Sequence, residues 1–105
     1  MPNETPSEVW KYPIPKVGIV FELEMPMGAK VLTMRFQRNR AVRFQQEVFF
    51  LWALVFPPSP KVKRKFLCTG TGHPIDPSLV PKLNYISTDM TEDGAFVWHL
   101  FEITE

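Results

Sequence analysis

The chain has 105 residues, of which 45% are hydrophobic and 13% aromatic, and its formal net charge is +1. This length allows one domain, and the composition is too apolar for a disordered chain and too polar for a membrane protein. The single cysteine, Cys68, excludes an internal disulfide framework, so the hydrophobic core must hold the fold together. The near-neutral charge excludes a generally basic protein that coats DNA.

The start of the chain is polar and contains two prolines and two glutamates, unlike the charged and then apolar pattern of a signal peptide. We therefore expect a flexible leader over residues 1–8 and a single β-rich domain over residues 9–105. The longest apolar run, Val48 to Pro58, is about half as long as a membrane-spanning helix. It predicts a buried core segment, and a soluble intracellular protein with no membrane partner is expected.

Alternation of apolar and polar residues indicates the first strands. A short strand is expected over Val9–Tyr12, ended by the prolines that follow it. Residues 19–24 and 31–37 alternate clearly, which predicts two half-buried strands. Because the turn residues 26–28 lie between them, these strands are predicted to pair as a hairpin. The side chains expected to face inward are Ile19, Phe21, Leu23, Leu32, Met34 and Phe36.

The segment from Arg38 to Phe56 has two interpretations in its first part. Residues 38–47 form either a short helix with Asn39 as its N-cap or the extended arm of a hairpin. From Val48 to Phe56 most residues are β-branched or aromatic, which favours a strand, and the absence of polar residues predicts burial on both faces. The proline-rich turn at 57–60 ends this strand.

Three more strands are expected in the C-terminal half. Residues 62–67 have the lysine-rich pattern of a protected edge strand, and residues 69–82 form a long ordered loop. Strands at 83–88 and 95–103 follow, joined by a hairpin turn at 91–94 that contains Asp-Gly. Six to seven short strands predict an all-β or β-dominated fold, a small antiparallel sandwich or barrel.

The strands at 48–56 and 95–103 are apolar on both sides, which is unusual in so small a domain because a small sheet usually keeps one face in contact with water. A short helix, the long loop or another copy of the chain would cover the second face. A homo-oligomer is one expectation, and a monomer with a well-covered central strand is the other.

Charge is segregated along the chain. Between residues 35 and 65 eight basic residues stand against one acidic residue, a net charge of +7, and the remainder carries −6. If the arm and the lysine-rich strand are neighbours, they form a basic patch suited to phosphate, nucleic acid or an acidic protein surface. If they are not neighbours, the basic residues only keep an exposed loop and an edge strand soluble. The residues expected to bind a partner are Arg35, Arg38, Arg40, Arg43, Lys63, Arg64 and Lys65.

The loop that begins at Thr69 contains a candidate ligand site. Gly70 and Gly72 allow a close approach to the backbone, and His73 follows them. The loop lacks the Lys-Ser/Thr pair of a P-loop and the third glycine of a dinucleotide-binding fold. It is therefore either a weak anion-binding loop or a rigid turn in which His73 hydrogen-bonds to the backbone.

No residue spacing supports a metal or catalytic site. His73 and His99 are the only histidines, and with a single cysteine they form no metal-binding motif, so no metal or cofactor is expected. Cys68 and the serines lack the sequence context of an activated nucleophile. We expect a binding protein and not an enzyme.

Several specific segments occur in order along the chain: Trp10-Lys11-Tyr12-Pro13, Leu51-Trp52-Ala53-Leu54-Val55, Gly70-Thr71-Gly72-His73-Pro74-Ile75 and Val97-Trp98-His99-Leu100-Phe101-Glu102. In these segments the chain resembles a family of small, mostly phage-encoded proteins of unassigned function. The resemblance implies a phage accessory protein, with residues 51–55 on a strand, and implies no reaction. Residues 38–50 depart from it, because they are longer and more basic than the turn expected there.

Small phage proteins without catalytic motifs often act by stoichiometric binding. We therefore expect an inhibitor of a bacterial defence system, with a CRISPR effector as one target, that acts in the host cytoplasm through its basic arm. Its partner would be a host defence protein, a nucleotide or nucleic acid. One alternative is a nucleotide-signal-binding sponge that presents Trp10, His73 and the arginines at an oligomer interface. The other is a virion or assembly component.

Overall fold

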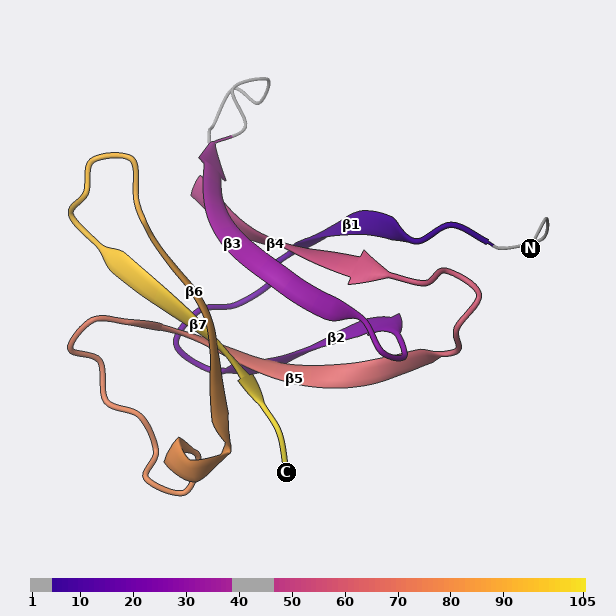
Figure 1. The fold of residues 1–105 in the computed structure, drawn as a ribbon. Helices are drawn as coiled ribbons and strands as arrows, with labels where there is room; N and C mark the ends of the chain where they lie inside the picture. Colours follow the sequence, from indigo (N-terminus) through magenta and orange to yellow (C-terminus); the bar gives the residue numbers. More distant parts are fainter. Residues whose placement is uncertain (1–4, 39–46) are drawn as a thin grey trace.

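A computed structural model describes residues 5–38 and 47–105 of the chain. Within these ranges seven strands form two antiparallel sheets, in the orders β1-β4-β3 and β2-β5-β7-β6 (Figure 1). The predicted all-β, sandwich-like fold is confirmed, and the sheets do not close into a barrel. The elements are β1 (Glu8–Pro13), β2 (Val20–Pro26), β3 (Lys30–Arg38), β4 (Glu47–Val55), β5 (Lys61–Gly70), the 3-10 turn η1 (Val80–Lys82), β6 (Leu83–Met90) and β7 (Val97–Ile103).

The predicted hairpin between residues 19–24 and 31–37 is wrong, because β2 pairs with β5 while β3 pairs with β4. The turn itself is present: the Ala29 N–H donates to the Pro26 carbonyl, and Gly28 has a positive φ of 82°. It carries the chain from one sheet to the other. Alternation indicates only that each strand has one apolar face, and two such faces can meet across a core instead of side by side.

The strands β3 and β4 form a hairpin whose last described pair is Arg38 opposite Glu47. Both ends of the segment predicted as a helix or an arm therefore belong to strands. Residues 39–46 between them lie outside the described residues, as do residues 1–4 of the predicted leader. The strand β1 begins at Glu8, the last residue assigned to that leader.

The prediction that the strand at 48–56 is buried on both faces is wrong. On β4, Phe49, Leu51, Ala53 and Val55 are buried, whereas the alternate side chains are half-buried and Leu54 is 42% exposed. The buried set packs in a core with Phe66 and Leu100 of the other sheet. Among the described residues no further layer of strands or helices lies over the opposite face, so the apolar pattern there stays at the surface.

Two residues predicted to face inward are exposed. Leu32 is 43% exposed because the register of β3 against β4 shifts between Val31 and Thr33, a β-bulge that leaves Leu32 without a partner on β4. Ile19 is 54% exposed because it precedes the first residue of β2. The other predicted inward residues, such as Phe21 and Met34, are in the core or pack against it.

The edges of the two sheets meet along β3 and β6 through side chains. The Phe36 N–H donates to Asp89 Oδ2 at 2.8 Å, and the hydroxyls of Thr33 and Ser87 lie 3.2 Å apart. A second bulge, between Tyr85 and Ser87, interrupts β6 at this point. Bulges and side-chain hydrogen bonds of this kind satisfy an edge without continuing the sheet.

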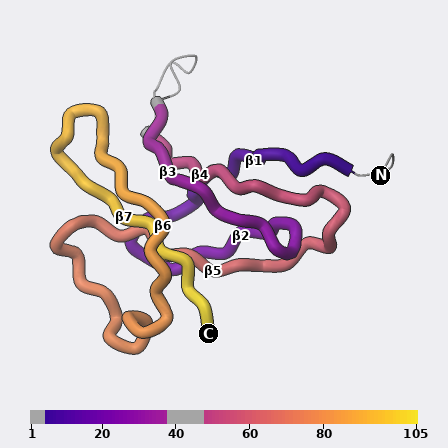
Figure 2. The backbone as a smooth tube through the Cα atoms, viewed as in Figure 1, coloured from indigo at the N-terminus to yellow at the C-terminus, as the bar shows by residue number. Residues whose placement is uncertain are grey.

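The prediction that the lysine-rich strand is an edge strand is wrong. This strand is β5, and it lies between β2 and β7. Its lysines face acids across the strand pair: Lys63 is opposite Glu24, and Lys65 is opposite Glu22. Opposite charges at directly paired positions stabilise a sheet, so these lysines are compatible with an internal strand. The connection from β5 to β6, residues 71–82, loops out beyond the sheets (Figure 2).

Candidate functional site

The described members of the predicted basic patch do not lie together in the structure. Arg35 is exposed on the outer face of the sheet β1-β4-β3, because its neighbours Met34 and Phe36 point into the core. Lys63 and Lys65 are exposed on the outer face of the other sheet. The side chain of Arg38, together with Arg40 and Arg43, lies outside the described residues.

Arg64 points inward and is engaged inside the protein. Its Nε and one terminal nitrogen donate to the two carboxylate oxygens of Glu102 on β7 at 2.6 and 2.7 Å, and its other terminal nitrogen donates to the Ala29 carbonyl. The two side chains are only 19% and 17% exposed. Arg64 thus links β5, β7 and the turn before β3, and its donors are occupied by the protein itself.

The basic surface that the structure does form lies on the outer face of the sheet β1-β4-β3. We call it the basic face and define it by the cations Lys11, Lys30 and Arg35 with the β4 side chains Phe50 and Trp52. Lys11 extends from β1 across β4: its Nζ lies 4.1 Å from the centroid of the Phe50 ring and 5.5 Å from that of Trp52. It ends 2.6 Å from Oε1 of Gln37 on β3.

The described outward positions of these three strands carry no carboxylate. Arg35 lies opposite Phe50, and Lys30 lies opposite Leu54. Leu54 in turn lies opposite Val9, and both are exposed apolar residues. A positive surface with an apolar centre attracts an acidic partner at long range and then buries apolar area on contact.

Sequence reasoning missed Lys11 and Lys30, which it counted with the acidic remainder of the chain. The alternation of Lys11 with Trp10 and Tyr12 could have predicted that Lys11 faces outward, because both aromatic residues pack against the core. Lys11 must therefore share a face with the outward residues of its neighbour strand. The predicted Trp10 is committed elsewhere, since its indole Nε1–H donates to Glu8 at 2.7 Å.

The predicted glycine loop is a tight turn. The His73 N–H donates to the Gly70 carbonyl at 3.0 Å, and Gly72 has a positive φ of 83°, which favours glycine. The Thr71 N–H donates to the Val97 carbonyl on β7. Since these two N–H groups already have acceptors, they are not available to an anion, and the rigid-turn interpretation fits better than the anion nest.

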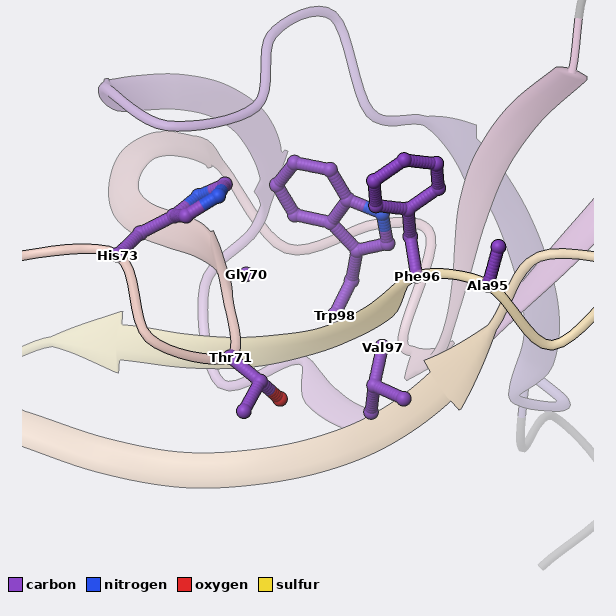
Figure 3. Close-up of a pocket in the computed structure, with 7 residues that line it drawn as sticks. All are labelled: Gly70, Thr71, His73, Ala95, Phe96, Val97 and Trp98. Carbon is purple, nitrogen blue, oxygen red and sulfur yellow. The ribbon is translucent and has the colours of Figure 1, made fainter.

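An open cavity of about 330 Å³ lies beside this turn. Of the predicted ligand loop, Gly70 and His73 line the cavity, whereas Gly72 is not among the described lining residues. Trp10, which the sponge alternative places with His73, is not among them either. The side chains of His73, Trp98 and Phe96 gather on one side of β7, and those of Thr71 and Val97 point to the other (Figure 3). The lining residues are Gly70, Thr71, His73, Ala95, Phe96, Val97 and Trp98. In the sequence, Phe96 and Trp98 belong to the strand expected at 95–103, which is apolar on both sides.

His99 has partners on both ring nitrogens. Its Nε2 lies 2.7 Å from the Thr71 hydroxyl and its Nδ1 lies 3.0 Å from the Thr88 hydroxyl. The Thr88 hydroxyl also lies 2.7 Å from that of Tyr85. These contacts tie the turn after β5 to β7 and β6, and they include no carboxylate that would make His99 a base.

Within residues 5–38 and 47–105, no group of three or more histidine, cysteine, aspartate or glutamate side chains could hold a metal ion. In the same ranges, no helix is long and apolar enough to cross a membrane.

Cys68 is buried, with its Sγ 3.8 Å from the sulfur of Met34, and burial raises the pKa of the thiol to about 12. We expect it to react with a disulfide reagent at pH 8 on the order of a hundredfold more slowly in the folded protein than in denaturant, because the thiolate is the nucleophile. Absorbance of the released thiolate measures both rates, and no second thiol interferes. Equal rates would contradict the burial of Cys68.

Comparisons with known proteins give a family but no activity. No curated protein matches the chain, and no solved structure matches it. One family model, described as "Domain of unknown function (DUF7352)", matches residues 6–105. This match covers the whole sandwich, including the basic face and the cavity beside His73, and the chain therefore belongs to the DUF7352 family.

Proposed function

We propose that this is a non-catalytic, phage-encoded binding protein that inhibits a bacterial defence system in the host cytoplasm, with a CRISPR effector as the first candidate target. The observation that supports it best is the basic face. Lys11, Lys30 and Arg35 share a sheet surface with the exposed apolar residues Val9 and Leu54, and the described outward positions of this surface carry no acid. The biological context comes from the resemblance of several sequence segments to small phage proteins of unassigned function.

The expected partner is an acidic surface of the defence protein. Three cations on one face raise the rate of encounter with such a surface and make binding sensitive to salt. Phe50 and Trp52 lie between these cations and supply the apolar area that a stable complex buries. In the sequence, Arg38, Arg40 and Arg43 follow shortly after Arg35. The positive charge of this segment also favours an acidic partner.

We expect Arg35→Glu to raise the amount of protein needed for half-inhibition about tenfold, a loss of about 1.4 kcal/mol of binding free energy. The unmodified protein, titrated into a panel of purified defence effectors that includes a CRISPR nuclease, should abolish the activity of its target near one equivalent. Lys82→Glu is the matched control, since it makes the same charge change at an exposed lysine of η1 in the other half of the chain.

Other outcomes would favour other functions. Equal inhibition by Arg35→Glu and the Lys82→Glu control would remove the basic face as the binding surface. Complete inactivation by far less than one equivalent would indicate an enzyme. A nucleotide sponge would show a thermal shift with cyclic or dinucleotides that Arg35→Glu abolishes. A virion or assembly component would form large particles in light scattering whatever the residue at 35, and the same measurement tests the predicted homo-oligomer.

A further inference from the structure

The cavity beside His73 is bordered by three aromatic rings. The rings of His73 and Trp98 meet edge to face, with centroids 5.5 Å apart and an interplanar angle of 80°. Phe96 precedes β7 and is 61% exposed, and it lines the same cavity as Trp98 (Figure 3). The cavity volume, about 330 Å³, falls within the range of small-molecule sites. An exposed aromatic ring on the wall of a cavity offers stacking surface to a flat ligand.

We propose that this cavity binds the base of a nucleoside or nucleotide. Aromatic side chains stack on bases of any kind because every base has a π face. The rings here come from two segments far apart in the sequence, His73 after β5 and Phe96 and Trp98 around the start of β7. They therefore form a site only in the folded protein.

The polar atoms of the cavity fit the edge of a base. Within the described part of the chain, neither the imidazole nitrogens of His73 nor the indole Nε1–H of Trp98 forms a hydrogen bond. A neutral imidazole offers one donor and one acceptor, and an indole offers one donor. A base edge presents carbonyl or ring-nitrogen acceptors together with N–H donors, and a simple hydrocarbon ring would leave these three groups unused.

The ring of His73 lies against Gly70, where there is no room for a side chain. A Cβ atom added at Gly70 would lie 2.8 Å from two atoms of the His73 ring, closer than such atoms approach in proteins. The absence of a side chain at residue 70 thus lets the imidazole lie against the end of β5. The hydrogen bond from the His73 N–H to the Gly70 carbonyl fixes the turn that carries the ring.

The site is expected to recognise the base and not the phosphate. Among the residues that the structure describes, no lysine or arginine lines the cavity, and the N–H groups of Thr71 and His73 already donate to carbonyls. A nucleoside and its monophosphate should therefore bind about equally well. This separates the cavity from the basic face, where charge is the main attraction, so that either site can be disproved without the other.

The experiment follows the indole N–H signal of Trp98 in a ¹⁵N–¹H correlation spectrum, identified as the one missing from Trp98→Phe. Adenosine and uridine at millimolar concentration are the probes. We expect a saturable shift of this signal with at least one of them, the same shift with its monophosphate, and none with ribose 5-phosphate. No shift with either nucleoside, or an equal shift with ribose 5-phosphate, would overturn the proposal. Tighter binding of N-acetyltryptophanamide than of either nucleoside would also overturn it, because that result would indicate a site for a peptide side chain.

The variant Phe96→Ala should weaken nucleoside binding about five- to tenfold, at the lower end of what one stacked ring contributes. Phe96 is exposed, so the fold does not depend on it, and signal dispersion in the same spectrum confirms folding. Phe56→Ala is the control because Phe56 is also an exposed phenylalanine but does not line the cavity. Unchanged affinity in Phe96→Ala, or equal losses in both variants, would contradict stacking in this cavity.

Discussion

Replacing Leu51 with alanine is expected to lower the free energy of unfolding by about 2–5 kcal/mol, whereas Leu54→Ala should lower it by less than about 1 kcal/mol. Both leucines lie on β4, three residues apart, but Leu51 is 0% exposed and Leu54 is 42% exposed. Leu51→Ala removes buried apolar surface and leaves a cavity between the two sheets. Leu54→Ala removes a side chain that is already in contact with water.

Urea unfolding of both variants measures the difference between their free energies of unfolding. The comparison requires that free energy falls with urea at the same slope in both. The pair tests whether β4 is buried on one face or two, because the sequence alone predicts that both faces are buried. If Leu54→Ala were as destabilising as Leu51→Ala, a second layer would cover the outer face in solution. Light scattering on the same samples would then show whether another copy of the chain supplies that layer.

Replacing Arg64 with methionine is expected to lower the free energy of unfolding by about 2–4 kcal/mol and the Tm by more than about 8 °C. Methionine keeps most of the apolar stem but leaves the Glu102 carboxylate, only 17% exposed, without its bidentate partner. The Ala29 carbonyl loses its donor in the same change. A charged group left partly buried and unpaired costs more than the original pair contributed.

Lys63→Met is the matched control, since Lys63 precedes Arg64 on β5 but is exposed on the outer face. It should change the free energy of unfolding by less than about 1 kcal/mol. The double variant Arg64→Met with Glu102→Leu should recover part of the lost stability, because it removes both charges. A different result would contradict this role of Arg64. If Arg64→Met were as stable as Lys63→Met and bound the partner more weakly, Arg64 would belong to the binding surface predicted from the sequence.

The strands themselves were predictable to within a few residues. The expected strand at 83–88 is found at Leu83–Met90, and that at 62–67 is found at Lys61–Gly70. Alternation, prolines and the Asp-Gly turn are local signals, and the hydrogen bond from the Gly94 N–H to the Thr91 carbonyl shows that this turn forms as expected. Local patterns fix where strands begin and end because backbone conformation depends on neighbouring residues.

The partners of those strands were not predictable in the same way. The hairpin expected around Gly28 became a crossing between sheets, and the lysine-rich strand lies between two others, with Glu22 and Glu24 opposite two of its lysines. A β-bulge at Leu32 turned a predicted core residue outward. Pairing depends on contacts between residues distant in sequence, and a bulge changes the face of a side chain without changing the pattern of apolar residues.

The sequence by itself determined that the protein is all-β and that its basic residues are concentrated between residues 35 and 65. It left open whether the glycine loop before His73 is a rigid turn or an anion-binding loop. The tertiary structure decided which charges share a surface: Arg35 joins Lys11 and Lys30 on one face, and Arg64 is withdrawn into an ion pair. It also decided that Phe96 and Trp98 meet His73 at a cavity. The physical reason is that composition and local pattern depend on the chain alone, whereas a binding surface depends on which strands pair and which side of each strand faces water.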